Sequence, residues 1–468
     1  MVATHPRVVV VGAGLAGLRC ANVLTRSGYF DVVVLECASR IGGRAWTVER
    51  LDDGGGLIEA GATYVHGTGG NPLVKLSALR NCAYRAEGRR SLRYGNGDEF
   101  PDGATFLAAW TWASNALASC GGVTPEDTEE RYAREASVGE AVRELAHKVA
   151  HHEGKGADDG ALFLEVVEHR LDFERVSVGD DVDGASLAAW GEYHERVGRA
   201  REPASGFGGV AEAVRGPTAV TLKSRASRIR RSPTGVTVDL ADGGGEVAGD
   251  YCVVTASLGA LKRGAIAFEP PLSRDNVDHT LLGFGTVNKV AVSWRRPWWR
   301  DLDDQRGEWD CVWRASDGAA LPEEAKWLRG VAKWKHEPQH RGPPVVLGWV
   351  AGEKENAQFE ALDDEALRRA AAGHVARLAG LRPGDAAFDD VVSGARLALR
   401  TRWGGPPHFG SYSFVPTGAG GIEFDHFAKP LDRLRFAGEH THRTRYSTAD
   451  GALLSARARM FGHGDSVT

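Results

Sequence analysis

The order of apolar and polar residues predicts a parallel β-α-β unit at the start of the chain. Residues 7–11 read Arg-Val-Val-Val-Val, a run that is typical of a central parallel strand buried on both faces. Apolar residues at helical spacing follow and predict a helix that ends at Gly28. A second apolar run at 31–35 ends on Glu36. This order of elements favours an α/β fold of the dinucleotide-binding type.

The rest of the chain carries weaker patterns of apolar residues, some with the spacing of a strand and some with that of a helix. Apolar alternation and turn residues predict strands over 220–229 and 235–240, a turn at Asp242-Gly243, several strands between 290 and 351, and a short strand that leads into Gly438. Helical spacing predicts helices over 138–145, 162–167 and 363–379 and one that starts near Gly451, with a loop over 154–160.

Composition fits a soluble globular protein with more than one domain. The chain has 468 residues, of which 42% are apolar and 25% charged. This length exceeds what one simple core accommodates, so two or more domains are expected. Lys plus Arg (57) against Asp plus Glu (62) gives a net charge of −5. This balance argues against a nucleic-acid partner, which would require a basic face.

The spacing of the cysteines and the length of the apolar runs argue against a metal-binding protein and a membrane protein. No C-x-x-C motif is present, so we expect no metal site, and buried free thiols are favoured, with Cys20, Cys37 and Cys252 beside predicted core elements. No apolar run has the length of a membrane span, and neither end carries a targeting pattern. We therefore expect no membrane partner and a cytoplasmic location.

Candidate chemistry begins in the turn of the β-α-β unit, where residues 12–17 read G-x-G-x-x-G. Gly12 permits a tight turn, Gly14 lets a pyrophosphate approach the backbone, and Gly17 lets helix and strand pack closely. The N-terminus of the following helix offers unpaired N–H groups to phosphates. Glu36 would accept hydrogen bonds from the adenosine ribose, and its charge disfavours a 2′-phosphate.

The residues after Glu36 distinguish flavin from nicotinamide. The run from Glu36 to Arg44 reads E-x-x-x-R-x-G-G-R and resembles the second fingerprint of the flavin-containing amine oxidase family. Arg40 and Arg44 can offset pyrophosphate charge with forked donors. The resemblance extends along almost the whole chain, through residues 61–67, 253–262, 283–289, 402–413 and 436–455. The last of these segments is similar to polyamine oxidases of the spermine and N1-acetylpolyamine type.

The resemblance implies a Rossmann-like FAD-binding domain of the GR2 type and a second, mixed α+β substrate-binding domain. The FAD domain would be discontinuous, built from 1–80, 205–285 and 395–468, and the substrate domain from 85–205 and 286–395. FAD would be non-covalent, because the covalent Cys of monoamine oxidases is missing. The resemblance and the Gly-rich turn together assign these residues to cofactor binding: Gly12, Gly14, Leu15, Ala16, Gly17, Glu36, Arg40, Gly43, Arg44, Gly61, Ala62, Thr63, Ala226, Trp403, Gly438, Glu439, Thr448 and Ala449.

The reaction that the resemblance implies is oxidation of a secondary amine of a polyamine. Hydride passes to flavin N5, the iminium hydrolyses to an aminoaldehyde, and O₂ reoxidises the flavin to give H₂O₂. Lys289 is the first catalytic candidate, a partly buried Lys that would hold a water beside N5 and handle a proton with a lowered pKa. His66 is the second, because it follows a segment expected beside the flavin ring and could bond the substrate nitrogen.

The resemblance implies substrate contacts at Tyr412, Tyr446 and Ser447. Aromatic faces beside the flavin can attract an ammonium, which fits the two tyrosines. Asp450 stands where the family has His and would add an acid near a cationic substrate. Which further acids line a substrate tunnel stays open among Glu165, Glu168, Glu174, Asp181, Asp183 and Glu192.

Three alternatives to a polyamine oxidase remain. One is another FAD amine or amino-acid oxidase. A second is a non-catalytic binding protein of the same fold, against which the retained Glu36, Lys289 and Glu439 argue. The third is desaturase or porphyrinogen-oxidase chemistry, which would require a membrane-binding stretch that the sequence does not show.

Overall fold

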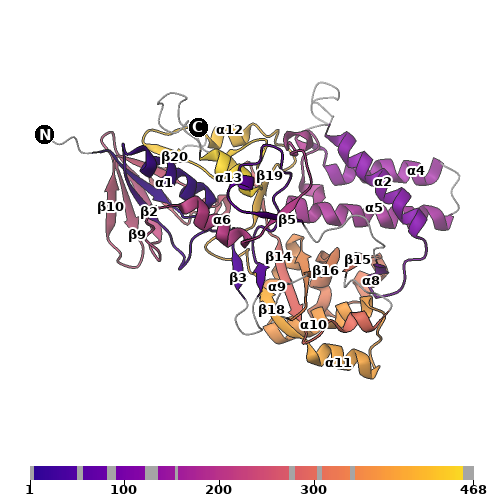
Figure 1. Cartoon of the computed structure of the whole chain (residues 1–468). Helices are drawn as coiled ribbons and strands as arrows, with labels where there is room; N and C mark the ends of the chain where they lie inside the picture. Colours follow the sequence, from indigo (N-terminus) through magenta and orange to yellow (C-terminus); the bar gives the residue numbers. More distant parts are fainter. Residues whose placement is uncertain are drawn as a thin grey trace.

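A four-stranded parallel sheet forms the centre of one half of the molecule (Figure 1). The computed structural model describes residues 5–49, 56–81, 91–121, 135–152, 157–272, 280–302, 308–337 and 343–456. The strand order of the sheet is β2-β1-β11-β20, with bounds β1 Arg7–Val11, β2 Asp31–Leu35, β11 Tyr251–Val254 and β20 Leu434–Phe436. Helix α1 (Leu15–Ser27) ends at Gly28, whose φ is 71°. The predicted β-α-β unit is confirmed.

The alternating side chains of β1 bury both faces of this sheet, as its continuous apolar run requires. Val8 and Val10 pack on one side with helices α1, α6 (Gly206–Arg215) and α13 (Ala449–Ser455). Val9 and Val11 pack on the other side against a second sheet of order β10-β9-β8-β12. Its strands are β8 Ala226–Arg231, β9 Val236–Leu240, β10 Glu246–Gly249 and β12 Ala267–Glu269.

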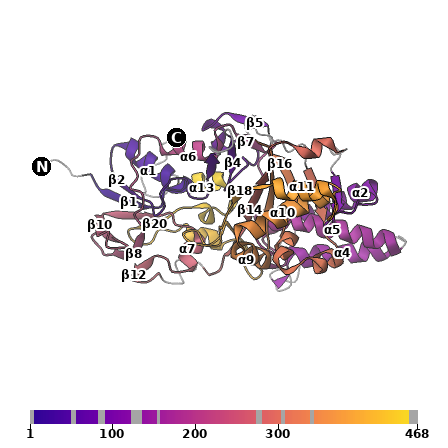
Figure 2. The same cartoon turned by 90° about the horizontal axis from the view of Figure 1, so that it is seen from below.

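A six-stranded sheet forms the core of the other half (Figure 2). Its order is β18-β14-β17-β16-β15-β6, and only the β15–β6 pair is parallel. The strands are β6 Ser91–Tyr94, β14 Asn288–Ser293, β15 Glu308–Val312, β16 Lys333–Glu337, β17 Val345–Val350 and β18 Arg396–Arg400. A Trp-rich core joins one face to η5 (Glu323–Gly330), α9 (Glu353–Ala361), α10 (Asp364–Leu378) and α11 (Ala386–Gly394).

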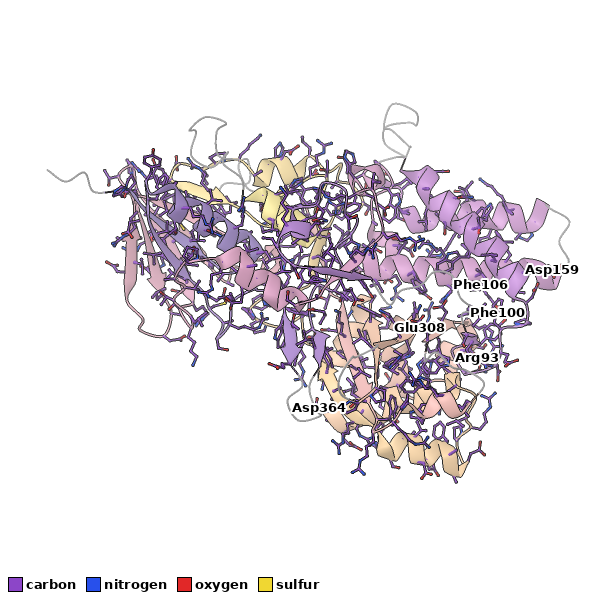
Figure 3. The ribbon with its side chains drawn as sticks, in the orientation of Figure 1. Arg93, Phe100, Phe106, Asp159, Glu308 and Asp364 are labelled. Atoms are coloured by element: carbon purple, nitrogen blue, oxygen red, sulfur yellow. The ribbon has the colours of Figure 1, made fainter. Side chains whose placement is uncertain are left out.

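A layer of long helices extends from this sheet. It contains α2 (Gly103–Cys120), α4 (Val138–His152) and α5 (Ala157–Val178), which share an apolar core. Phe100 and Phe106 join the layer to the β6 end of the sheet, with ring centroids 5.7 Å apart (Figure 3). Short elements complete the chain: β3 Thr47–Glu49, β4 Leu57–Glu59, β5 Leu79–Asn81, β7 Arg201–Pro203, β13 Gly283–Gly285, β19 Tyr412–Phe414, α7 Leu258–Lys262, α8 Ala315–Ala320 and α12 Glu423–Phe427.

Most predicted elements are confirmed, including α4, α5, α10, the strands between 290 and 351, and the Asp242-Gly243 turn, where both residues have positive φ. The strand over 220–229 is wrong in its first half. Residues 221–224 instead bond to Val34 of β2 and to Glu36 and Ala38 after it, and β8 begins only at Ala226. The loop over 154–160 is wrong from residue 157 onward, because α5 begins there; residues 153–156 lie outside the described part.

The cysteine prediction is partly wrong. Cys20, Cys120, Cys252 and Cys311 are buried free thiols, but Cys37 is exposed because it lies just beyond the end of β2. Cys82 lies outside the described residues. In the described part of the chain, no helix has the length and apolarity needed to cross a membrane. The division of the chain into domains stays a prediction.

Acid should destabilise the six-stranded half through His374, which α10 places against the sheet. Trp334 Nε1 donates to His374 Nδ1 at 3.0 Å, and Nε2 lies 3.1 Å from the Gly95 carbonyl oxygen. Burial lowers the pKa of His374 from 6.5 to about 3. The unfolded chain therefore takes up this proton below pH 6.5 and the folded chain does not. Between pH 7 and pH 5 this site should lower the free energy of unfolding by about 2 kcal/mol.

Urea unfolding at the two pH values measures this effect. The His374→Gln variant should lose about 2 kcal/mol of the difference between pH 7 and pH 5, and the exposed His151→Gln variant should keep all of it. An unchanged pH difference in His374→Gln would contradict this assignment.

Candidate active site

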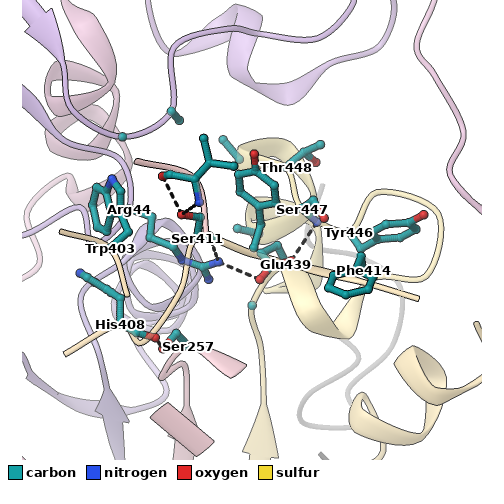
Figure 4. A pocket seen from close by; sticks show the side chains of 18 of the residues that line it. Arg44, Ser257, Trp403, His408, Ser411, Phe414, Glu439, Tyr446, Ser447 and Thr448 are labelled. Carbon is teal, nitrogen blue, oxygen red and sulfur yellow. Dashed lines mark hydrogen bonds and ion pairs between the residues drawn. The ribbon is translucent and has the colours of Figure 1, made fainter. Parts of the chain in front are cut away.

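An elongated cavity of about 1630 Å³ joins the two halves of the molecule. Its walls come from the C-terminal edge of the parallel sheet, one face of β14 and β16, helix α5 and the first residues of α13. The segments that line it are far apart in the sequence, as the close-up in Figure 4 shows for residues between Arg44 and Thr448. Of the predicted cofactor residues, all but Gly17 and Arg40 line this cavity.

The Gly-rich turn is shaped as its spacing predicts. A Cβ on Gly17 would lie 2.0 Å from the Gly12 carbonyl oxygen, so α1 and β1 touch there. Gly12 has φ 106°, and a Cβ on it would lie 2.6 Å from Thr255 Oγ1. A Cβ on Gly14 would meet no atom within 4 Å, so this glycine leaves the cavity open at the N-terminus of α1. Leu15 and Ala16, the first residues of α1, line the same end.

Glu36 is buried at the end of β2 and shapes this end of the cavity. Its Oε2 accepts from the Ala13 N–H at 2.6 Å, and its Oε1 accepts from the Ala38 N–H at 2.8 Å. Ala226, at the start of β8, lines the cavity as well. A buried carboxylate next to a glycine turn fits the ribose of a dinucleotide.

Arg44 and Glu439 form an ion pair in the middle of the cavity wall. Arg44 Nη1 lies 2.8 Å from Glu439 Oε1 and donates to the Ser411 carbonyl oxygen at 2.7 Å (Figure 4). The other oxygen of Glu439 accepts from Ser413 Oγ at 2.5 Å and from the Ser447 N–H at 2.8 Å. Burial opposes the charge of Glu439, but Arg44 and the other donors hold its pKa below the ordinary value.

The C-terminal segment contributes a second helix N-terminus. Thr448 caps α13, because its Oγ1 accepts from the Gly451 N–H at 3.0 Å. Gly438 has φ 152°, and a Cβ on it would lie 2.6 Å from the His440 ring. Gly438, Thr448 and Ala449 all line the cavity.

Lys289 lies on β14, and only 5% of its surface is exposed. Its Nζ donates to the Glu59 carbonyl at 2.8 Å, the Gly61 carbonyl at 2.5 Å and Thr63 Oγ1 at 2.6 Å. The predicted segment of Gly61, Ala62 and Thr63 is therefore fixed beside the predicted catalytic lysine.

Two aromatic rings close this region. Trp403 Nε1 donates to the Ala60 carbonyl at 3.1 Å, which holds the ring against the segment that Lys289 also holds. The Trp349 ring centroid lies 5.9 Å from Lys289 Nζ. Both tryptophans line the cavity, as Lys289 does, so this region combines a cation with flat apolar faces.

The predicted substrate residues lie farther along the cavity. Tyr412 donates its hydroxyl to the Val176 carbonyl of α5, and burial raises its pKa. Tyr446 stacks on Phe424 with ring centroids 4.7 Å apart. Ser447 donates its hydroxyl to the Ser413 carbonyl.

His66 also faces the cavity, in the loop that follows Thr63 and Tyr64. The surrounding protein lowers its pKa by desolvation, and the nearby Arg445 guanidinium lowers it further. The ring therefore favours its neutral form, which can both donate and accept a hydrogen bond.

Arg40 and most of the candidate acids do not line the cavity. Arg40 stacks on Trp46, with its Cζ 4.4 Å from the ring centroid. Of the acids left open as tunnel residues, only Glu174 lines the cavity, where it pairs with Arg170 at 2.6 Å. The others bond to Tyr94 or to arginines away from it: Glu165, Glu168, Asp181, Asp183 and Glu192.

Several cavity residues gave no sequence signal. His408 packs 5.1 Å from Trp403, and burial, with Arg44 and Arg40 nearby, lowers its pKa to about 3. Lys333 and Lys335 of β16 line the wall farther from the turn, as does Glu195. An alternating Lys-x-Lys in a strand reads as a solvated face, so only the tertiary structure shows these lysines to be buried.

The fold and the cavity define a dinucleotide-binding oxidoreductase with a separate substrate half. The family model "Flavin containing amine oxidoreductase" matches residues 15–85 and 126–459. Polyamine oxidase 1 of Oryza sativa subsp. japonica is 33% identical over 97% of this chain and 96% of its own length. The chain belongs to the flavin containing amine oxidoreductase family.

A further curated relative and a solved structure are also similar to this chain. The bovine peroxisomal N(1)-acetyl-spermine/spermidine oxidase is 30% identical over 96% of this chain and 93% of its own length. The solved structure of cyclohexylamine oxidase from Brevibacterium oxydans covers 97% of both chains with a TM-score of 0.69. At 16% identity this second match shows the fold alone.

The cavity fits FAD, which is the cofactor of this chain. The open space above Gly14 and the uncapped N-terminus of α1 suit a pyrophosphate, and the buried Glu36 suits a ribose. Arg44 lines the wall between this end and Lys289. The flavin ring would lie among Trp403, Gly61 and Lys289. The enzyme is an FAD-dependent amine oxidase.

Proposed function

We propose that this enzyme is a polyamine oxidase that oxidises a secondary amine of spermine, spermidine or an acylated polyamine, with O₂ as acceptor. The main support is the similarity to rice polyamine oxidase 1 over nearly the full length of both chains. Bound FAD supplies the hydride acceptor. The cytoplasmic location inferred from the sequence stays a prediction.

The residues of the chain supply binding, orientation and proton handling around that acceptor. Trp403 and Trp349 flank the reactive end and exclude water, which strengthens electrostatic interactions within it. Neutral His66 can accept a proton from the substrate ammonium, so that the amine reacts uncharged. Tyr412 and Tyr446 offer aromatic faces to a remaining ammonium.

One feature of the wall favours an acylated polyamine over a free one. Lys289 pairs with Trp349 across β14 and β17, and Lys335 pairs with Leu347 across β17 and β16. Because Trp349 and Leu347 are two residues apart on one strand, both lysines share a face of the sheet. Lys333, two residues from Lys335, lies on the same face about two strand spacings, roughly 10 Å, from β14.

These lysines suit an acceptor oxygen at the far end of the substrate. Lys335 Nζ lies 3.3 Å from the Tyr64 hydroxyl and 3.8 Å from Glu202 Oε1. Lys333 Nζ lies 3.3 Å from Glu308 Oε2 and 3.8 Å from Asp310 Oδ1. Of these groups, only the two lysines and Tyr64 line the cavity, and their partner carboxylates do not. Ammonium groups donate hydrogen bonds and cannot accept them, so this wall complements an acyl carbonyl better than a second ammonium. The Tyr64 hydroxyl adds a polar oxygen to this wall.

The proposed reaction is tested by the absorbance spectrum of the purified holoenzyme. Anaerobic addition of spermine, N1-acetylspermine or thermospermine in separate cuvettes should bleach the flavin bands with at least one of them. Bands that persist with all three, in a preparation that a secondary monoamine does bleach, would contradict polyamine oxidation and keep the amine oxidase.

The acyl preference predicts a larger kcat/KM for N1-acetylspermine than for spermine. Lys335→Met should reduce this ratio about ten-fold, the value of one charge-assisted hydrogen bond. Lys326→Met, which removes an exposed lysine on η5, should leave the ratio unchanged. A ratio below one in the unmodified enzyme would exclude the preference.

A further inference from the structure

Asp450 is an acid that the amine oxidation described above does not use. It lies in the first turn of α13 and is only 1% exposed, and it does not line the cavity. Arg445 holds it with two bonds, Nε to Oδ2 at 2.9 Å and Nη2 to Oδ1 at 3.0 Å. Arg196 Nε lies 2.9 Å from the same Oδ2. Two guanidinium groups therefore neutralise a charge that the sequence placed near the substrate.

The Arg196 side of this network holds the His66 loop. Arg196 Nη1 donates to the Gly70 carbonyl at 3.0 Å and lies 3.4 Å from the Gly69 carbonyl. The loop packs tightly there, because a Cβ on Gly67 would lie 2.4 Å from the Arg196 carbonyl oxygen. Gly67, Gly69 and Gly70 lie within four residues after His66, so the position of the ring depends on this contact.

The Arg445 side holds the segment that carries Tyr193. Arg445 Nη1 donates to the His194 carbonyl at 2.5 Å, and its Cζ lies 4.8 Å from the Tyr193 ring centroid. Tyr193 in turn packs edge-on against Tyr446 at 5.6 Å. Both tyrosines line the cavity.

We propose that Asp450 is a positioning residue that fixes His66 and Tyr193 relative to α13. The first residues of α13 line the cofactor cavity, while His66 and Tyr193 line its substrate half, so one carboxylate joins the two. This inference rests on amine oxidation and not on the identity of the amine. It assigns to Asp450 a role through two arginines, in place of direct contact with a substrate cation.

Hydrogen exchange of the FAD-loaded enzyme tests the positioning role of Asp450 without turnover. Asp450→Asn keeps the shape of the side chain and removes its charge, and we expect exchange at least ten-fold faster within residues 66–70 and 193–197. Exchange in α1 should stay unchanged. Asp389→Asn, on the exposed face of α11, is the control and should alter neither segment. Unchanged exchange in a folded, FAD-loaded Asp450→Asn enzyme would overturn the proposal.

Kinetic measurements distinguish the positioning role of Asp450 from a direct contact between Asp450 and the substrate. With N1-acetylspermine and N-methylbutylamine as probes, Asp450→Asn should lower kcat/KM by the same factor, about ten-fold or more, for both amines. A loss of kcat/KM confined to the amine with more charges would mean that Asp450 binds the substrate directly, and it would overturn the positioning role. Asp450→Glu should recover part of the loss. If Asp450→Asn does not fold, Arg196→Gln should accelerate exchange in 66–70 alone, and failure to do so would also overturn it.

Discussion

Replacing Lys289 with Met is expected to slow amine-dependent flavin reduction by about 10²–10³-fold while FAD stays bound. Met keeps the length of the side chain and removes its charge and its donors. Lys289 Nζ is surrounded by oxygens of Glu59, Gly61 and Thr63, so it can hold or move a proton at that position. Anaerobic stopped-flow absorbance measures the rate of reduction, and the flavin-to-protein absorbance ratio measures retention.

A purely structural role for Lys289 predicts a different result. The lysine holds the 59–63 segment in place, so its loss would then lower FAD retention and thermal stability together with the rate. Lys148→Met, on the exposed face of α4, is the matched control and should change none of these. A Lys289→Met enzyme that reduces its flavin at the normal rate would exclude the catalytic role.

Elements defined by local pattern could be predicted, and those defined by distant partners could not. The run of valines in β1 and the αL residue at Gly28 set the first unit through the properties of a few neighbouring residues. The segment 221–224 alternates polar and apolar residues at its start, but it bonds to the end of β2 and the residues after it instead of continuing β8. Its partner is almost two hundred residues earlier, so no short window of sequence contains the information.

The same distinction applies to the site. Gly12, Gly14 and Glu36 act within one β-α-β unit, so their spacing carries their geometry. Lys333 belongs to the cavity only because β16 pairs with β17, which pairs with β14.

The role of a charged residue is harder to predict from the sequence than its position in the site. Asp450 was expected to add negative charge near the substrate, and the structure pairs it with Arg196 and Arg445. Arg196 is more than two hundred residues away in the chain. Whether a buried acid acts as a charge or as an anchor depends on such partners, which a motif does not include.

The Arg44–Glu439 pair explains why both ends of the chain are needed for one cofactor site. Arg44 follows the first β-α-β unit and Glu439 follows β20, yet their side chains meet at 2.8 Å on the cavity wall. Glu439 also fixes the Ser447 N–H, and therefore the approach to α13. The cofactor cavity is thus completed only when the C-terminal segment is folded against the N-terminal one.

Replacing Glu36 with Ala is expected to weaken FAD binding by about 10²–10³-fold, the value of one or two charge-assisted hydrogen bonds. Two effects add: the ribose loses its acceptor, and the Ala13 and Ala38 N–H groups lose the carboxylate that orders the turn. Dialysis followed by the flavin-to-protein absorbance ratio, with titration of FAD into the apoprotein, measures the change.

Two variants make the Glu36 prediction specific. Glu36→Gln keeps one acceptor oxygen in place and should retain more FAD than Glu36→Ala, because it preserves part of the turn. Glu212→Ala, on the exposed face of α6, should bind FAD as the unmodified enzyme does. If Glu36→Ala purifies with full flavin content and unchanged affinity, the contact with the ribose is absent, and the bonds from Glu36 to the turn are not needed for FAD binding.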